Sequence, residues 1–193
     1  MRLAILDSGH SFRMKVLFAC IRAISRLPVP DAIKLNRYRP DFYGTPMRVV
    51  AQEAMRGPPA WSVGDRELMG ASVSKTNECE VCTKTHAGVA ALAYQDEARV
   101  FSALADLDAA AIEEPLRATL RMLRKLTREH AVDADDISAV LAAGVSREQI
   151  EDALTVCFTF NVVDRLSRAF GFVVSSPKTF EAGAKFLLAR GYR

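Results

Sequence analysis

Two cysteines and a histidine lie close together in one short segment of the sequence. Cys79, Cys82 and His86 are separated by three and four residues, a spacing that brings their side chains to one face of a helix. The N-terminus of a helix favours negative charge, so a thiol placed there beside an imidazole readily becomes a thiolate. The pattern indicates redox chemistry at a Cys-x-x-Cys pair.

A carboxylate twelve residues before the first cysteine completes the candidate site. In one unbroken helix Glu67 would lie about 18 Å along the axis from Cys79, too far to interact. The polar residues 74–77 predict a turn, however, and an antiparallel helix hairpin around this turn places Glu67 opposite His86. Glu67, His86 and a thiol in series would form a proton relay.

The elements that must position these side chains are predicted to be helices. Apolar residues recur at helical spacing along the chain, and no alternating stretch is long enough for a convincing strand. Helix starts are indicated by four signals: Thr45-Pro46, Asp133 with Asp136, Ser146 with Gln149, and Ser176-Pro177. We expect an all-α protein with an N-terminal helical arm at residues 1–44, an irregular stretch at 38–44, and one domain at 45–193.

Length and composition exclude several classes of protein. A net charge of +3, with Lys and Arg spread along 193 residues, does not suit a nucleic-acid-binding protein. No apolar stretch approaches the roughly 20 residues that a membrane-spanning helix needs. The apolar run Val16 to Ile21 lies between Lys15 and Arg22 and is too short for a signal peptide. We therefore expect a cytoplasmic protein with reduced thiols and no membrane partner.

The remaining cysteines and histidines are predicted to have structural or surface roles rather than chemical ones. A structural zinc ion needs four ligands, and no second Cys-x-x-Cys or His pair is present, so we expect no metal and no other cofactor. Cys20 and Cys157 are isolated on apolar faces and are predicted to be core residues. His130 is predicted to lie at a helix C-terminus, and His10 at the surface.

The apolar C-terminal helices leave two questions open. Asn161 lies one helical turn after Cys157, and we expect a satisfied core amide there rather than a residue lining a substrate pocket. Phenylalanines at 158, 160, 170 and 172 are predicted to serve the core or a subunit interface, and only secondarily a pocket for an apolar ligand.

The pattern Glu67, eleven residues, Cys79-x-x-Cys82-x-x-x-His86 resembles the motif of the alkylhydroperoxidase AhpD and its relatives. These proteins form the peroxidase-related branch of the carboxymuconolactone decarboxylase-like superfamily. The stretch from Leu141 to Leu166 is similar to the same branch, so the likeness covers roughly residues 45–175. It implies an all-helical, oligomeric fold, with a homo-oligomer as the expected state.

The resemblance also implies a function and a role for each residue. The function is thiol-dependent reduction of hydroperoxides, with a lipoyl-type or thioredoxin-like dithiol protein as the reductant. Cys82 would become a sulfenic acid, Cys79 would donate a proton and then close the disulfide, and Glu67 with His86 would form the relay. Spacing and helix dipole alone favour Cys79 as the more acidic thiol, whereas the family precedent and the nearness of His86 favour Cys82.

One residue departs from the family pattern, and two other functions are alternatives to the peroxidase. Val81 stands where the best-known members have a histidine, which bears on peroxidase efficiency and on the natural reductant. A lactone decarboxylase is disfavoured because those members do not rely on a Cys-x-x-Cys pair. A redox sensor without turnover, or a vestigial superfamily member, is the remaining alternative.

Overall fold

The computed structural model describes residues 1–58 and 60–192, and over these residues the chain is helical with no strand. The all-α prediction is confirmed. The N-terminal part contains α1 (Ile5–Ser8), α2 (Phe12–Ser25), α3 (Asp31–Tyr38) and the short π-helix η1 (Pro40–Gly44). The rest contains α4 (Thr45–Arg56), α5 (Val63–Thr76), α6 (Glu80–Tyr94), α7 (Glu97–Ala105), α8 (Glu114–Glu129), α9 (Ala134–Ala142), α10 (Arg147–Phe170) and α11 (Pro177–Arg190).

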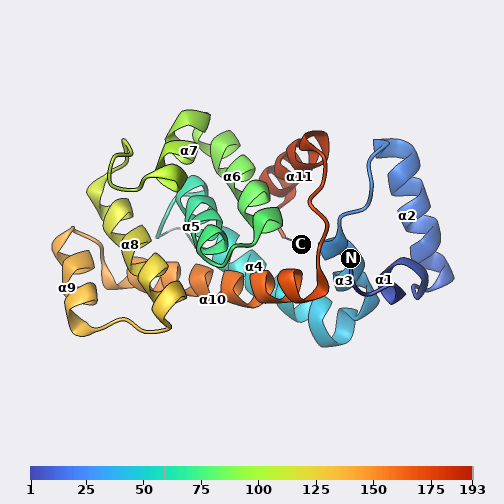
Figure 1. Cartoon of the computed structure of the whole chain (residues 1–193), viewed down its shortest axis with the longest axis horizontal. Coiled ribbons are helices and arrows are strands. Elements are labelled where there is room, and N and C mark those ends of the chain that lie inside the picture. Colours follow the sequence, from blue (N-terminus) through green and yellow to red (C-terminus); the bar gives the residue numbers. More distant parts are fainter. Residues whose placement is uncertain (59, 193) are drawn as a thin grey trace.

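Helix α5 forms the centre of the core. Its residues from Arg66 to Ser74 are buried, and α6, α8 and α10 pack around it (Figure 1). Gly70 lets α10 pack closely here, because a Cβ atom at this position would lie 2.5 Å from the ring of Phe160. The helix that carries Glu67 is therefore held from several sides, which fixes the direction of its side chains.

The hairpin between α5 and α6 forms as predicted, but its turn lies later in the sequence. Helix α5 continues to Thr76, and the chain reverses at residues 77–79, where Glu78 has a positive φ of 56°. The polar side chains expected to break the helix have partners that leave it intact: Ser74 Oγ donates to Asp164 of α10, and Thr76 Oγ1 donates to the Ser72 carbonyl one turn earlier in the same helix. Because these groups do not compete with the helix, the predicted turn at 74–77 is wrong by about three residues.

Three of the four helix-start signals in the sequence are confirmed by capping contacts, whereas α4 begins at Thr45 without a side-chain cap. Asp133 with Asp136 and Ser146 with Gln149 form complete capping boxes, and Ser176 accepts from the Thr179 backbone N–H. Thr45-Pro46 begins α4 as expected. The segment before it, predicted to be irregular, is the π-helix η1.

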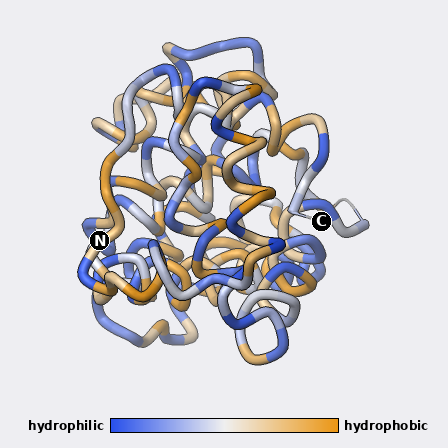
Figure 2. The backbone as a smooth tube through the Cα atoms, turned by 90° about the vertical axis from the view of Figure 1, so that its right-hand side faces the viewer, coloured by the Kyte–Doolittle hydropathy of each residue, from blue (hydrophilic) through white to orange (hydrophobic). Residues whose placement is uncertain are grey.

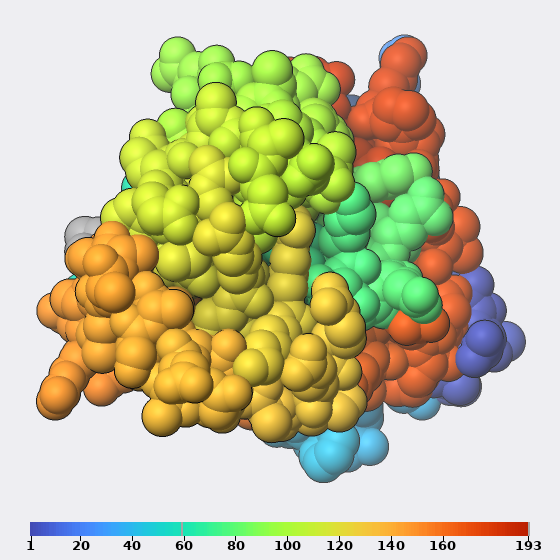
Figure 3. All heavy atoms as spheres, turned by 60° about the vertical axis from the view of Figure 1, so that its left-hand side comes forward, coloured from blue at the N-terminus to red at the C-terminus, as the bar shows by residue number. Residues whose placement is uncertain are grey.

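The N-terminal helices lie at one end of the molecule, and α2 stands away from the bundle (Figure 1). Hydrophobic and hydrophilic residues are interspersed along this part of the chain (Figure 2). Seen from the side formed by α7, α8 and α9, the N-terminal part of the chain is visible only at the edges of the molecule (Figure 3). Backbone contacts such as Arg2 N–H to the Phe170 carbonyl, 2.7 Å, join it to α10. A domain boundary at residue 44 stays a prediction.

Two predictions about single residues of the arm are wrong. Cys20, expected in the core, is exposed, because α2 has few neighbours to cover its apolar residues. His10, expected at the surface, is buried: its ring meets the edges of Phe18 and Tyr38, and Nε2 bonds to the Leu6 carbonyl at 2.9 Å. His130 lies at the C-cap of α8 and Cys157 in the core, both as predicted.

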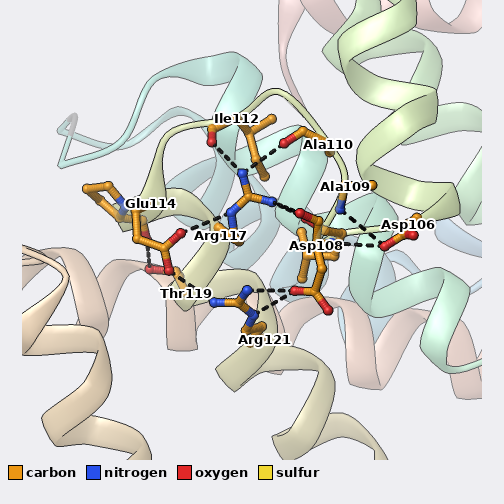
Figure 4. A network of polar contacts seen from close by, with 11 residues as sticks. Asp106, Asp108, Ala109, Ala110, Ile112, Glu114, Arg117, Thr119 and Arg121 are labelled. Atoms are coloured by element: carbon orange, nitrogen blue, oxygen red, sulfur yellow. Dashed lines mark hydrogen bonds and ion pairs between the residues drawn. The ribbon is translucent and has the colours of Figure 1, made fainter.

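One half-buried arginine organises the loop between α7 and α8. The Arg117 guanidinium donates to the carbonyls of Leu107, Asp108, Ala110 and Ile112, and Arg121 beside it pairs with Asp108 (Figure 4). A loop without regular structure thereby satisfies its polar backbone groups.

Among the residues that the structure describes, no helix combines the length and apolarity needed to cross a membrane.

Candidate active site

The carboxylate of Glu67 and the imidazole of His86 are in direct contact. Glu67 Oε2 lies 2.7 Å from His86 Nδ1, and the Glu67 side chain is completely buried. Helix α5 supplies the first residue and α6 the second, so the hairpin places them opposite each other. Since an ionised carboxylate accepts only, Nδ1 carries the proton and Nε2 is left to accept one.

Two residues from outside the hairpin stabilise this buried pair. Arg56 Nη2 of α4 lies 2.7 Å from Glu67 Oε1, and the Tyr192 hydroxyl donates to the same oxygen at 3.0 Å. Burial and the Glu67 charge hold the pKa of Tyr192 well above its ordinary value, so the phenol stays a donor. A buried carboxylate is costly unless it is paired, and here a cation and two further donors satisfy it.

The His86 ring is fixed on its faces and edge as well. Phe160 meets it edge-on with ring centroids 4.5 Å apart, and Tyr192 lies nearly parallel to it at 6.1 Å. The Nε2 atom has no hydrogen-bond partner among residues 1–58 and 60–192, and the ring lines a cavity. The exposed part of this imidazole is therefore available to a ligand.

The two cysteines lie beside each other at the start of α6. Both are buried, and the structure holds them as free thiols whose sulfur atoms lie within 4.8 Å of each other and of an Asp164 carboxylate oxygen. The spacing argument assumed that Cys79 lies within the helix. It is instead the N-cap residue, with φ −92° and ψ 88°. The turn before α6, rather than a helix face, brings it to Cys82.

The environment separates the acidities of the two thiols. Contact with Cys82 lowers the pKa of Cys79, whereas contact with Cys79, burial and the Asp164 charge raise the pKa of Cys82 well above its usual value. As the pH rises, the first deprotonation of the pair therefore falls on Cys79, with the proton remaining on Cys82. This order agrees with the dipole argument from the sequence.

Asp164 is a residue of this site that the sequence analysis did not assign. It is buried in α10, accepts from Ser74 Oγ at 2.9 Å and from Asn77 Nδ2 at 3.0 Å, and lies beside both sulfur atoms. Burial raises its pKa, and its hydrogen-bond donors oppose that effect. The side chain of Asn161 bonds to the Cys157 carbonyl and to Asn77, and it does not line the cavity, which supports the core interpretation.

A cavity of about 350 Å³ reaches only part of the site. Cys82 and His86 line it, whereas Cys79 and Glu67 lie behind them and do not. The structure thus brings the four predicted residues together in two contacting pairs, and one member of each pair faces the same space. A small molecule in the cavity would meet the Cys82 thiol and the His86 imidazole.

Few sequence patterns mark the residues around this arrangement. Arg56 and Tyr192 come from α4 and from the end of the chain, where no motif marks them. Asp164 lies in the stretch that resembles the peroxidase-related branch, and this was the single signal available for it. Long-range packing, which local patterns do not encode, supplies all three.

Comparison with known proteins identifies the fold. No family model matches the sequence, and no curated protein matches it significantly. Solved structures do match over nearly the whole chain. An uncharacterized peroxidase-related protein from Silicibacter sp. TM1040 is 18% identical, with a TM-score of 0.77 over 93% of each chain.

Two further structures agree with the first. An uncharacterized peroxidase-related protein from Ralstonia eutropha JMP134, described as an alkylhydroperoxidase AhpD core, is 18% identical, with a TM-score of 0.74 over 95% of this chain and 96% of that one. The debrominase Bmp8 is 14% identical, with a TM-score of 0.68 over 90% and 92%. The chain has the AhpD-like fold, as the resemblance implied.

Proposed function

We propose that this protein is a thiol-dependent peroxidase that reduces hydroperoxides through Cys79 and Cys82. The observation that carries the proposal is the joint exposure of Cys82 and His86 to one cavity, each backed by its buried partner. Access favours Cys82 as the attacking thiol, although Cys79 is the more acidic one. A peroxide in the cavity reaches the Cys82 sulfur and not the Cys79 sulfur.

The first step transfers an oxygen atom to Cys82. His86 Nε2 accepts the Cys82 proton, and the resulting Cys82 thiolate attacks the terminal oxygen of ROOH. The S–O bond forms as the O–O bond breaks, and the protonated imidazole gives its proton to the leaving RO⁻. The products are Cys82 sulfenic acid and the alcohol ROH. Glu67 stabilises the imidazolium and keeps Nε2 directed at the cavity.

The second step closes the disulfide. The Cys79 thiolate attacks the sulfenic sulfur of Cys82, and hydroxide leaves and is protonated to water. Asp164, next to both sulfur atoms and with a raised pKa, is placed to exchange the proton. The sum is two thiols plus ROOH giving a disulfide, ROH and water. An external dithiol of the lipoyl or thioredoxin type then reduces the disulfide by exchange.

Turnover of cumene hydroperoxide with dithiothreitol or dihydrolipoamide tests the proposal. A rate proportional to protein concentration, lost in Cys82→Ser and reduced in His86→Ala, is the expected result. Sulfenic acid formation without turnover would favour the redox sensor. If the protein does not accelerate the loss of peroxide at all, the peroxidase proposal is wrong. In that last case a lactone decarboxylase assay becomes the next measurement.

A bound zinc ion is the competing assignment. Cys79, Cys82 and Asp164 offer three donor atoms within 4.8 Å of one another, and no fourth His, Cys, Asp or Glu joins them among the described residues. Three ligands with an open position suit a catalytic zinc rather than a structural one. Stoichiometric zinc in protein purified without chelator, with both thiols unreactive until it is removed, would favour zinc over the peroxidase.

Replacing Asp164 with asparagine should make Cys82 more acidic. The carboxylate raises the pKa of this thiol, so removing the charge stabilises the thiolate and shifts its titration to lower pH. We expect the midpoint of iodoacetamide alkylation at Cys82, followed against pH by peptide mass spectrometry, to fall by about one unit. Disulfide closure should slow, because a proton carrier is lost.

The matched control for this experiment is Asp135→Asn, which removes an exposed carboxylate from α9. Its alkylation profile should coincide with that of the parent protein. An unchanged Cys82 midpoint in correctly folded Asp164→Asn would mean that this carboxylate does not act on the thiols.

A further inference from the structure

The cavity above Cys82 and His86 is built from parts of the chain that are distant in sequence. The N-terminal arm contributes Ile33 and Tyr43, α4 contributes Met47, and α11 contributes Phe180 and Phe186. With the walls from α6 and α10, these residues enclose about 350 Å³ of mostly apolar space. Such a volume lies within the range of sites for organic ligands, about 300–1,000 Å³, and hydrogen peroxide would leave it nearly empty.

Cations lie at the rim of this apolar space. Arg37 of α3 is exposed and Arg48 of α4 is half-buried, and both line the cavity. Neither guanidinium has an ion-pair or hydrogen-bond partner among residues 1–58 and 60–192. Asp31, the acid that also lines the cavity, is already engaged by Lys34 Nζ at 3.1 Å and by the Val173 backbone N–H at 3.0 Å.

The walls and the rim together describe an amphipathic organic anion. Methionine and phenylalanine side chains favour a flexible apolar body, and a guanidinium suits a carboxylate because it can donate two parallel hydrogen bonds to it. A neutral hydroperoxide such as cumene hydroperoxide would satisfy the walls and leave the arginines without a partner. Hydrogen peroxide would satisfy neither.

We infer that the cavity binds the hydroperoxide of a long-chain carboxylic acid, with the chain along the apolar walls and the carboxylate at Arg37 and Arg48. This inference rests on the proposed function for its chemistry: Cys82 takes the terminal oxygen, the O–O bond breaks, and the product is the corresponding hydroxy acid and, after disulfide closure, water. The binding itself does not depend on turnover. It can therefore be tested separately.

Calorimetric titration of the full chain with the changes Cys79→Ser and Cys82→Ser is the test, since this protein cannot react. Ricinoleic acid, a long-chain hydroxy acid below its micelle concentration, serves as a product probe, and its methyl ester is the neutral match. We expect the acid to bind at least about tenfold more tightly than the ester, the difference that one charge-assisted contact supplies. Adding Arg37→Gln and Arg48→Gln should bring the acid to the level of the ester.

Two further variants separate cavity binding from general attraction. Gly183 lines the cavity, and a Cβ atom there meets nothing within 4 Å, so the side chain introduced by Gly183→Leu starts in open space and improves helix propensity. It should weaken acid and ester alike by about tenfold without lowering the thermal midpoint. Arg13→Gln with Arg22→Gln, on α2 outside the cavity lining, should change neither affinity.

The outcomes distinguish this inference from the proposed function. Equal affinity for acid and ester, no binding of either, or no effect of Gly183→Leu would overturn the inference, even if the active protein reduces cumene hydroperoxide. Selective binding of the acid would support it even if no hydroperoxide is turned over. In that second case the cavity is a binding site for an organic acid, and the proposed peroxidase activity is wrong.

Discussion

Peroxide turnover should fall by at least about a thousandfold when Cys82 is replaced by serine, because a serine hydroxyl at neutral pH is a far weaker nucleophile than a thiolate. Cys79→Ser should also stop turnover, but at a later step. It should release one equivalent of alcohol and accumulate Cys82 sulfenic acid, since only the resolving thiol is missing. Product yield in a single turnover, with dimedone labelling of the sulfenic acid, separates the two variants.

Cys20→Ser is the matched control for these variants, because Cys20 is the exposed free cysteine on α2. It should keep full turnover. If Cys82→Ser released the first equivalent of alcohol and Cys79→Ser did not, the order of attack would be reversed. The acidity of Cys79 would then outweigh the access of Cys82 to the cavity.

Loss of the Glu67–His86 contact should have the next largest effect. His86→Ala removes the group that accepts and returns the proton, and we expect turnover to fall by about 100- to 10,000-fold. Glu67→Gln keeps the shape but no longer stabilises the imidazolium, and it leaves Arg56 without its buried anion. Turnover should fall by about 100-fold, and the free energy of unfolding by about 3 kcal/mol.

The double variant distinguishes a relay from two independent contributions. If Glu67 acts through His86, Glu67→Gln combined with His86→Ala should be no slower than His86→Ala alone. Thermal unfolding of each variant accounts for the stability loss separately. Fully multiplicative losses of turnover in folded protein would mean that the carboxylate does not work through the imidazole.

Local patterns predicted the helices well because they are marked by caps and by helical spacing. The capping boxes at Asp133 and Ser146 form as expected, and the hairpin that joins Glu67 to His86 follows from a polar break in the apolar pattern. The position of the break was wrong because Ser74 bonds to Asp164, a partner in α10 that the local sequence does not reveal, and because Thr76 bonds back to the Ser72 carbonyl within the helix. Propensity yields to tertiary contact at such residues.

The rest of the site depends on contacts between distant elements. Asp164 reaches the thiols from α10, and Arg56 and Tyr192 reach Glu67 from α4 and the C-terminal end. No spacing rule relates these residues to the Cys-x-x-Cys pair. The same is true of the cavity, whose arm residues are brought to Cys82 by packing alone. Pairs within one hairpin can be predicted from sequence, whereas the groups that set their acidity cannot.

Val81 acquires a role in this arrangement. The residue that replaces the histidine of the best-known AhpD-like proteins lines the cavity, where it extends the apolar wall beside Cys82. A polar group at this point is thus exchanged for surface that an apolar ligand can cover. This exchange fits a peroxidase with a bulky organic substrate better than one for hydrogen peroxide.

The most direct test oxidises the reduced protein, without oxygen, with one equivalent of cumene hydroperoxide and maps its sulfur atoms by mass spectrometry. The proposed chemistry predicts one molecule of cumyl alcohol per chain, a disulfide joining Cys79 to Cys82, and recovery of both thiols with dihydrolipoamide. Unreacted thiols at 79 and 82, with peroxide left intact or consumed at Cys20 on the surface, would contradict it.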